Sequence, residues 1–141
     1  MDRWQALFDR GGRALADGAM GTMLFEQGLE SGGAPELWNL EKPERVAAIH
    51  RGYLEAGADL ILTNTFGGNR FRLALPGMEG RVAELNGAGA ALARQAALAL
   101  GDRVVVAGDI GPGGGILEPL GDLAYASAVD GFAEQARAFT T

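Results

Sequence analysis

Cysteine is absent from this 141-residue chain, and histidine occurs once, as His50. The absence of cysteine excludes disulfide bonds and any thiolate chemistry supplied by this chain. Transition-metal sites such as zinc centres draw mainly on cysteine and histidine side chains. If the protein works with such a metal, we therefore expect the ligands to lie outside this chain. We expect His50, in the middle of a predicted helix, to be structural.

Long apolar runs and basic clusters are also missing. No apolar run approaches the roughly 20 residues that span a bilayer, and the first residues lack the basic-then-apolar order of a secretory signal. The net charge is −6 and the 12 lysines and arginines are scattered, whereas a nucleic-acid surface needs clustered positive charge. We therefore expect a cytoplasmic protein that binds a small molecule, with neither nucleic acid nor membrane as a partner.

The composition is that of one globular domain with an excess of glycine. Hydrophobic residues make up 48% of the chain and charged residues 21%. Many of the 23 glycines follow apolar segments, as at Gly18 and Gly21, at Gly67 and Gly68, and through residues 111–115. Glycine at such junctions indicates sharp turns, or places where the backbone approaches a ligand closely.

The spacing of apolar residues predicts alternating helices and strands. Intervals of three and four residues predict helical segments at residues 4–8, 22–27, 43–57, 82–99 and 125–139. In the last of these, Val129, Phe132, Ala136 and Phe139 are expected to share one face. Short apolar segments predict strands at residues 13–17, 59–65 and 103–109, and the apolar centre of the second is typical of a parallel strand covered on both faces.

Three strand-then-helix units predict an α/β protein with a parallel sheet. Two architectures fit this pattern. Length favours a doubly wound sheet, because a (β/α)₈ barrel needs roughly 250 residues. The polar and glycine clusters at three consecutive strand ends favour the carboxyl-terminal rim of a barrel, since doubly wound folds concentrate binding at a switch point.

The run Asp17-Gly18-Ala19-Met20-Gly21-Thr22 follows the first predicted strand. A carboxylate at a strand end, followed by a turn of small residues with free backbone N–H groups, can hold both charges of an amino acid. The ammonium group would lie on Asp17 and the carboxylate on the turn. The alternative is an ordinary tight turn in which Asp17 caps the following helix.

Two further clusters follow the later strands. Residues 63–66, Thr-Asn-Thr-Phe, place three polar side chains at a strand end, where we expect solvent or a ligand to complete their hydrogen bonds. Residues 109–115 are glycine-rich but lack the lysine and hydroxyl residue of a phosphate loop, and no dinucleotide fingerprint is present. The third cluster is therefore predicted to be a turn that lies close to a substrate, or simply a turn.

Other positions keep two interpretations open. Trp38 and Asn39 precede the first long helix, as a loop anchor packed on the core or as part of a substrate wall. Arg70 and Arg72 follow the second strand, as solvated loop charges or as ligand contacts near the mouth of the site.

Taken together, these blocks resemble the homocysteine S-methyltransferase family. The blocks that carry the resemblance are residues 16–22, 36–39, 58–68 and 107–112 with 117–121. The pattern is similar both to bacterial betaine–homocysteine methyltransferases and to the homocysteine module of cobalamin-dependent methionine synthase. The blocks do not separate these two.

The resemblance implies a (β/α)₈ barrel that binds homocysteine at its carboxyl-terminal rim and activates the thiol on zinc. A methyl group from betaine, or from a folate or cobalamin donor, then gives methionine. The resemblance places Asp17 at the substrate ammonium group and the amides of Gly18, Ala19 and Met20 at the carboxylate. It further implies substrate contacts from the remaining matched positions: Trp38, Asn39, Thr63, Asn64, Thr65 and Phe66.

The chain also departs from the family pattern. The family's zinc ligands are cysteines on later strands, and a glutamate ends its fourth strand; none of these has a counterpart here. We therefore expect residues 1–141 to be a partial homocysteine-binding barrel domain of about three βα units, truncated before the fourth strand. It would hold no catalytic or metal-ligating residue and would be inactive alone, while the full-length protein could form a homo-oligomer. The alternative is a small α/β module that binds an amino acid without catalysis.

Overall fold

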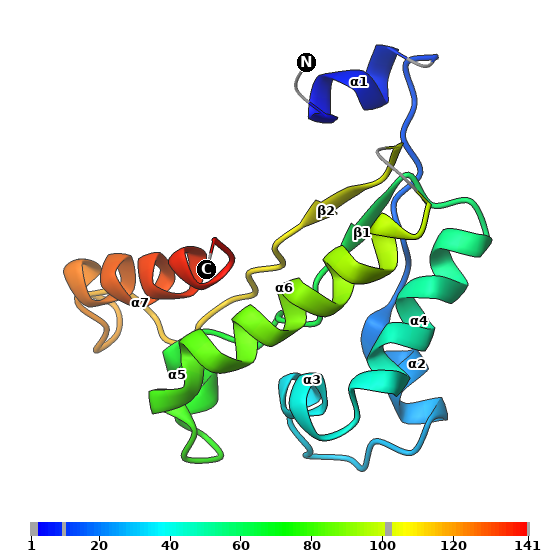
Figure 1. The fold of residues 1–141 in the computed structure, drawn as a ribbon. Coiled ribbons are helices and arrows are strands. Elements are labelled where there is room, and N and C mark those ends of the chain that lie inside the picture. The colour runs from blue at the N-terminus through cyan, green and yellow to red at the C-terminus, as the bar shows by residue number, and fades with distance from the viewer. Residues whose placement is uncertain (1–2, 10, 101–102, 141) are drawn as a thin grey trace.

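The computed structural model describes residues 3–9, 11–100 and 103–140, which fold into helices around a short parallel sheet (Figure 1). In chain order the elements are α1 (Arg3–Asp9), α2 (Met20–Glu26), η1 (Pro35–Leu37), α3 (Trp38–Glu41), α4 (Pro43–Glu55), β1 (Leu60–Leu62), α5 (Arg70–Leu73), η2 (Glu79–Arg81), α6 (Val82–Leu98), β2 (Val105–Ala107) and α7 (Tyr125–Ala138). The α/β class and the predicted helical segments are confirmed.

The two strands run parallel, with Leu60 opposite Val105 and Leu62 opposite Ala107. Both are shorter than the predicted strands at residues 59–65 and 103–109. The regular ladder ends near Thr63, whose amide still donates to the Ala107 carbonyl oxygen at 3.0 Å. Beyond this point side chains replace the ladder, because the threonine hydroxyl groups bond to the backbone of the neighbouring segment.

The predicted strand at residues 13–17 is wrong. This segment runs beside β1 but forms only an isolated parallel bridge, between Ala16 and Leu60. The Leu15 amide donates to the side chain of Asp59 at 3.0 Å instead of to a strand carbonyl. The ladder therefore cannot extend toward the N-terminus, although the Asp17 amide still donates to the Leu60 carbonyl oxygen at 2.9 Å.

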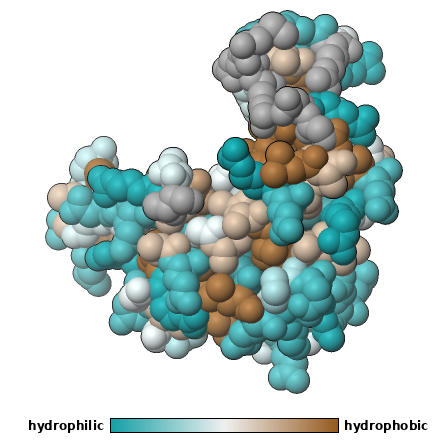
Figure 2. All heavy atoms as spheres, in the orientation of Figure 1, coloured by the Kyte–Doolittle hydropathy of each residue, from teal (hydrophilic) through white to brown (hydrophobic). Residues whose placement is uncertain are grey.

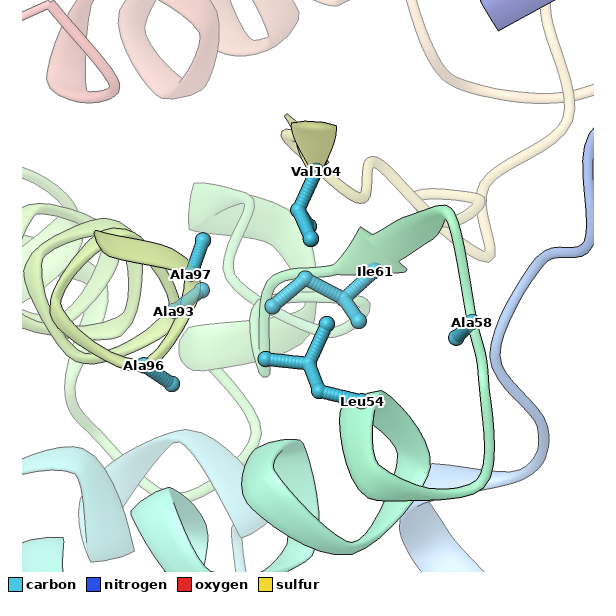
Figure 3. Packing of buried hydrophobic residues seen from close by; sticks show 7 residues of the cluster. All are labelled: Leu54, Ala58, Ile61, Ala93, Ala96, Ala97 and Val104. Atoms are coloured by element: carbon cyan, nitrogen blue, oxygen red, sulfur yellow. The ribbon is translucent and has the colours of Figure 1, made fainter. Parts of the chain in front are cut away.

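A hydrophobic core joins α4 and α6 to the strands. Figure 3 shows Leu54 and Ile61 pointing toward each other, with the small side chains of Ala93 and Ala97 facing them from α6. Because alanine extends so little from the helix, α6 can pack closely against the strands. A second cluster contains Leu24, Leu29, Trp38, Val46 and Ile49, and it fixes α2 and the loop after it against α4.

The predicted face of α7 is wrong. Val129 is 48% exposed, and Ala136 is also exposed, whereas the buried residues are Ala128, Gly131, Gln135 and Ala138. The helix approaches through these small residues because the Phe71 ring occupies the space beside Gly131, where a Cβ atom would lie 2.5 Å from the ring. Phe132 instead meets Phe71 edge to face, with ring centroids 5.9 Å apart.

Hydrophilic residues cover much of the face seen in Figure 2, and hydrophobic residues gather between α1 and the rest of the molecule. Helix α1 stands apart from the other helices (Figure 1). Within the described ranges, none of the helices combines the length and apolar character needed to cross a membrane.

Candidate functional site

A cleft with a volume of about 610 Å³ lies at the carboxyl ends of the strands. Its walls are formed by residues 17–21, 32–36 and 62–67, with Arg72, Leu73, Leu75, Pro76 and Asp109. The structure thus brings together the predicted site residues that follow the first two predicted strands: Asp17, Gly18, Ala19, Met20, Thr63, Asn64, Thr65 and Phe66. Trp38 and Asn39 are not part of the cleft wall.

Asp17 is fixed at the cleft by its side chain. One carboxylate oxygen, Oδ2, accepts a hydrogen bond from the Leu62 amide at 2.9 Å. The other, Oδ1, is buried and has no hydrogen-bond partner among the described residues. Burial raises the pKa of the Asp17 carboxyl above its ordinary value; the Leu62 amide opposes this shift, and the negative charge of Asp109 adds to it. A cationic donor bonded to Oδ1 would satisfy both the oxygen and the charge.

The turn after Asp17 is anchored on α4. The Tyr53 hydroxyl donates to the Ala19 carbonyl oxygen at 3.0 Å. Any larger residue at position 18 would displace the Tyr53 side chain, because a Cβ atom there would lie 2.9 Å from the Tyr53 hydroxyl oxygen. The N-cap of α2 is Ala19, and no side chain caps the helix. The interpretation of Asp17 as a helix cap is therefore wrong, and the carboxylate joins the turn to β1 instead.

The threonine hydroxyl groups at the end of β1 already form hydrogen bonds within the protein. The Thr63 and Thr65 hydroxyl oxygens lie 2.6 Å apart. Thr65 donates to the Asp109 carbonyl oxygen at 2.8 Å, and the Asp109 amide donates to Thr63 Oγ1 at 2.9 Å. The expectation that solvent or a ligand completes this set is wrong for these hydroxyl groups, since the backbone of Asp109, after β2, completes it. Phe66, by contrast, is 59% exposed at the cleft.

Asn39 and Trp38 support the cleft from behind. Asn39 Nδ2 donates to the Asn64 carbonyl oxygen at 2.8 Å, and Asn39 Oδ1 accepts from Asn64 Nδ2 at 2.9 Å. Trp38 is buried in the cluster beneath α2, with Lys42 Nζ 4.4 Å from its ring centroid. Of the two interpretations of Trp38, the structure matches the loop anchor packed on the core.

Two acidic groups at the cleft were missing from the predicted site. Glu36 is 4% exposed, and its Oε1 accepts from the Gly67 amide at 2.6 Å. Burial raises the pKa of Glu36, and the charge of Arg72 partly offsets this. Asp109 also lines the cleft, and burial raises the pKa of its carboxyl. The signal for Asp109 is its place at a predicted strand end, like that of Asp17. Glu36 lies in the matched block 36–39, but its place in the chain gives no sign that its side chain faces the cleft.

Arg70 and Arg72 have different environments. Arg70 Nε lies 2.7 Å from Glu134 Oε2 in an exposed ion pair on the outer side of α5 and α7. Arg72 lines the cleft and acts on Glu36 through its charge. The cleft therefore combines three acidic side chains with one arginine, a charge distribution that suits a zwitterion with its ammonium group toward the acids.

The residues of this chain do not fit a zinc site. The sequence has no cysteine, and His50 is buried within α4, away from the cleft. Among the described residues no three histidine, cysteine, aspartate or glutamate side chains gather closely enough to hold a metal ion. The predicted structural role of His50 agrees with its burial in the helix.

Comparison with known proteins identifies the family. The model of the homocysteine S-methyltransferase family matches residues 14–141. Methionine synthases from Mycobacterium tuberculosis and Mycobacterium leprae are 39% and 37% identical to this chain, each over 86% of it but only 11% of the relative. The metallated form of the homocysteine methyltransferase MmuM from Escherichia coli superposes with a TM-score of 0.81 at 25% identity, over 99% of this chain and 54% of that one. The chain thus spans about half of the solved enzyme, and it belongs to the homocysteine S-methyltransferase family.

Proposed function

We propose that the cleft binds the amino-acid end of homocysteine, as part of a homocysteine S-methyltransferase. The observation that carries this proposal is the buried Asp17 Oδ1, which lacks a partner among the described residues at the wall of a cleft in a family defined by homocysteine. An unpaired buried carboxylate oxygen is costly, and an ammonium group is a strong donor for it.

In this proposal each end of the amino acid has its own contacts. The ammonium group bonds to Asp17, and the charge of Asp109 adds to the attraction. The carboxylate lies against the backbone amides of Gly18, Ala19 and Met20, in the turn that Tyr53 fixes. The exposed ring of Phe66 offers an apolar surface to the methylene chain of the substrate.

The wider architecture is also a proposal. We take the described strands and the segment at residues 13–17 to be the first three strand positions of a (β/α)₈ barrel. The extent of the superposition on MmuM supports this, because it covers 99% of this chain. The contacts of the thiol and of the methyl donor, whether betaine or a folate or cobalamin compound, lie beyond the residues described here.

Calorimetric titration of the 141-residue chain with L-homocysteine tests the proposal. We expect saturable binding that Asp17→Asn weakens by about 10- to 100-fold, the effect of losing a charged hydrogen bond. Asp130→Asn, a matched loss of an exposed carboxylate on α7, should leave the affinity unchanged. No binding by a folded chain, or equal binding by Asp17→Asn, would contradict the proposal.

A measurement of methyl transfer distinguishes this proposal from the alternative, in which the chain is a module that binds an amino acid without taking part in catalysis. With homocysteine, betaine and zinc supplied, we expect this chain to bind homocysteine without forming methionine. Joined to the remainder of a family barrel in one polypeptide, it should support methionine formation, and Asp17→Asn should raise the KM for homocysteine. Homocysteine binding that never supports transfer in such a chimaera would favour the module.

A further inference from the structure

Gln135 is a fully buried amide on α7, on the face that carries Ala128, Gly131 and Ala138. A buried amide is costly unless it forms hydrogen bonds, so its contacts explain why it is tolerated among small residues. Its Nε2 donates to the Thr65 carbonyl oxygen at 2.8 Å and to Asn86 Oδ1 at 3.0 Å, and lies 3.4 Å from the Asp109 carbonyl oxygen. One side chain therefore reaches the ends of both strand segments.

The surroundings fix the orientation of this amide. Three acceptor oxygens face its nitrogen, so a flipped side chain would place its own oxygen against them. In the observed orientation Gln135 Oε1 is buried without a partner among the described residues. The unpaired oxygen costs stability, which shows that the donor contacts decide how the side chain sits.

The same contacts hold the backbone of Asp109 from both sides. Thr63 Oγ1 accepts from the Asp109 amide at 2.9 Å, and Thr65 Oγ1 donates to the Asp109 carbonyl oxygen at 2.8 Å. Gln135 Nε2 lies 3.4 Å from that carbonyl oxygen and donates to the Thr65 carbonyl oxygen at 2.8 Å. Asn86, its third contact, donates onward to the Gly68 carbonyl oxygen at 2.8 Å, so α6 belongs to the same network.

We propose that Gln135 is a positioning residue for the amino-acid site: it holds the Asp109 backbone beside Thr65 and thereby sets where the Asp109 carboxylate stands relative to Asp17. The inference rests on the proposed function of the cleft. Gln135 does not line the cleft. It acts through Asp109, whose negative charge interacts with the carboxyl groups of Asp17 and Glu36. Arg72 is the positively charged residue that lines the same cleft.

Two substitutions separate positioning from simple packing. Gln135→Met keeps the length of the side chain but removes the donor, and we expect it to raise the Kd for L-homocysteine about tenfold. Gln135→Glu carries a donor only while its carboxyl is protonated, and burial raises the pKa of such a group. Relative to the unaltered chain at each pH, this variant should bind weakly at about pH 8 and recover at about pH 6.

A ligand-free measurement accompanies the titrations. The carboxyl carbon of Asp17, followed by NMR through a pH series, should titrate at lower pH in Gln135→Met, because Asp109 is no longer held near it. The matched control is Ala128→Gly, which lies on the same buried face and loosens α7 without removing a donor. It should lower the melting temperature while leaving the Kd and the Asp17 titration unchanged.

The outcomes are distinct. A folded Gln135→Met that binds and titrates like the unaltered chain overturns the inference, as does an equal loss of affinity in Ala128→Gly. If Gln135→Met fails to fold, the pH-dependent recovery of Gln135→Glu decides, and its absence counts against positioning. If the unaltered chain does not bind homocysteine, the proposed function fails, and the Asp17 titration still decides the role of Gln135.

Discussion

Asp17 accepts a hydrogen bond from the Leu62 amide at 2.9 Å and so joins the turn before α2 to the end of β1. This contact uses one carboxylate oxygen, and the other is buried without a hydrogen-bond partner among the described residues. In the proposed function, substrate recognition and strand alignment thus share one side chain. Substitutions at position 17 are expected to affect both.

The first prediction concerns the pH dependence of binding. The pKa of Asp17 is raised, chiefly by burial, so its carboxyl takes up a proton at higher pH than an ordinary aspartate. Only the ionised form attracts an ammonium group, so the affinity for homocysteine should fall as the pH drops through this raised pKa. Calorimetry over a pH series measures the fall. In Asp17→Asn the affinity should be low and its fall with pH smaller, because only the more distant charge of Asp109 remains to titrate. A fall as large as in the unaltered chain would assign it to a group other than Asp17.

The second prediction concerns Gly68, where a Cβ atom would lie 2.8 Å from Asn86 Nδ2. Asn86 is fully buried and bonds to the Gly68 and Val82 carbonyl oxygens, so it cannot move aside freely. Gly68→Ala should therefore lower the free energy of unfolding by about 1–3 kcal/mol, measured by urea denaturation. Gly80→Ala is the matched control, since nothing lies within 4 Å of its Cβ position. Equal effects in the two variants would disprove the crowding.

The third prediction concerns His50, whose ring nitrogens are buried without partners among the described residues. Burial lowers the pKa of His50 from 6.5 to about 4 in the folded chain. The unfolded chain therefore binds a proton at higher pH than the folded chain, and the stability present above pH 6.5 is lost as the pH falls toward 4. The slope from this group is about 1.4 kcal/mol per pH unit.

The raised pKa values of Asp17, Glu36 and Asp109 act in the opposite direction, because the folded chain binds their protons more readily. The contribution of His50 is therefore measured as the difference between the unaltered chain and His50→Leu in urea denaturation from pH 7 to 4. His50→Leu should remove the slope that the histidine contributes. Parallel curves for the two proteins would rule out a titrating His50.

The fourth prediction concerns zinc. Because the chain has no cysteine and its only histidine is buried, we expect no stoichiometric zinc to remain bound after dialysis, as measured by atomic absorption. A chelator should change neither the melting temperature nor the affinity for homocysteine. Tight retention of one zinc ion per chain would show that carboxylates of the cleft form a site after all.

Much of the fold follows from local patterns in the sequence. The three-and-four spacing of Val46, Ile49 and Tyr53 predicts α4, and Gly57 after it takes the left-handed backbone (φ +103°) that ends the helical run. Asp17 and residues 63–66 follow predicted parallel strands, and the structure places them at one cleft because the carboxyl ends of such strands meet at the same edge. Helix spacing and helix ends depend on residues close together in the chain, so they can be predicted from the sequence.

The errors concern contacts between distant segments. The apolar stripe of α7 predicts that this stripe is the packing face. In the structure the Phe71 ring occupies the space beside Gly131, so the helix packs through its small residues instead. The local sequence predicts that solvent or a ligand completes the hydrogen bonds of Thr63 and Thr65, because it does not show that the Asp109 backbone lies beside them. Glu36 is absent from the predicted site because its partner, the Gly67 amide, is distant in the chain.

The threonine pair bonds to the main chain at position 109 and not to its side chain. Every residue except proline offers the same amide and carbonyl groups, so this link is indifferent to which side chain stands there. The charge at position 109 can thus change over evolution while the loop keeps its course. The electrostatics of the cleft can therefore be altered at position 109 without a new scaffold for the loop.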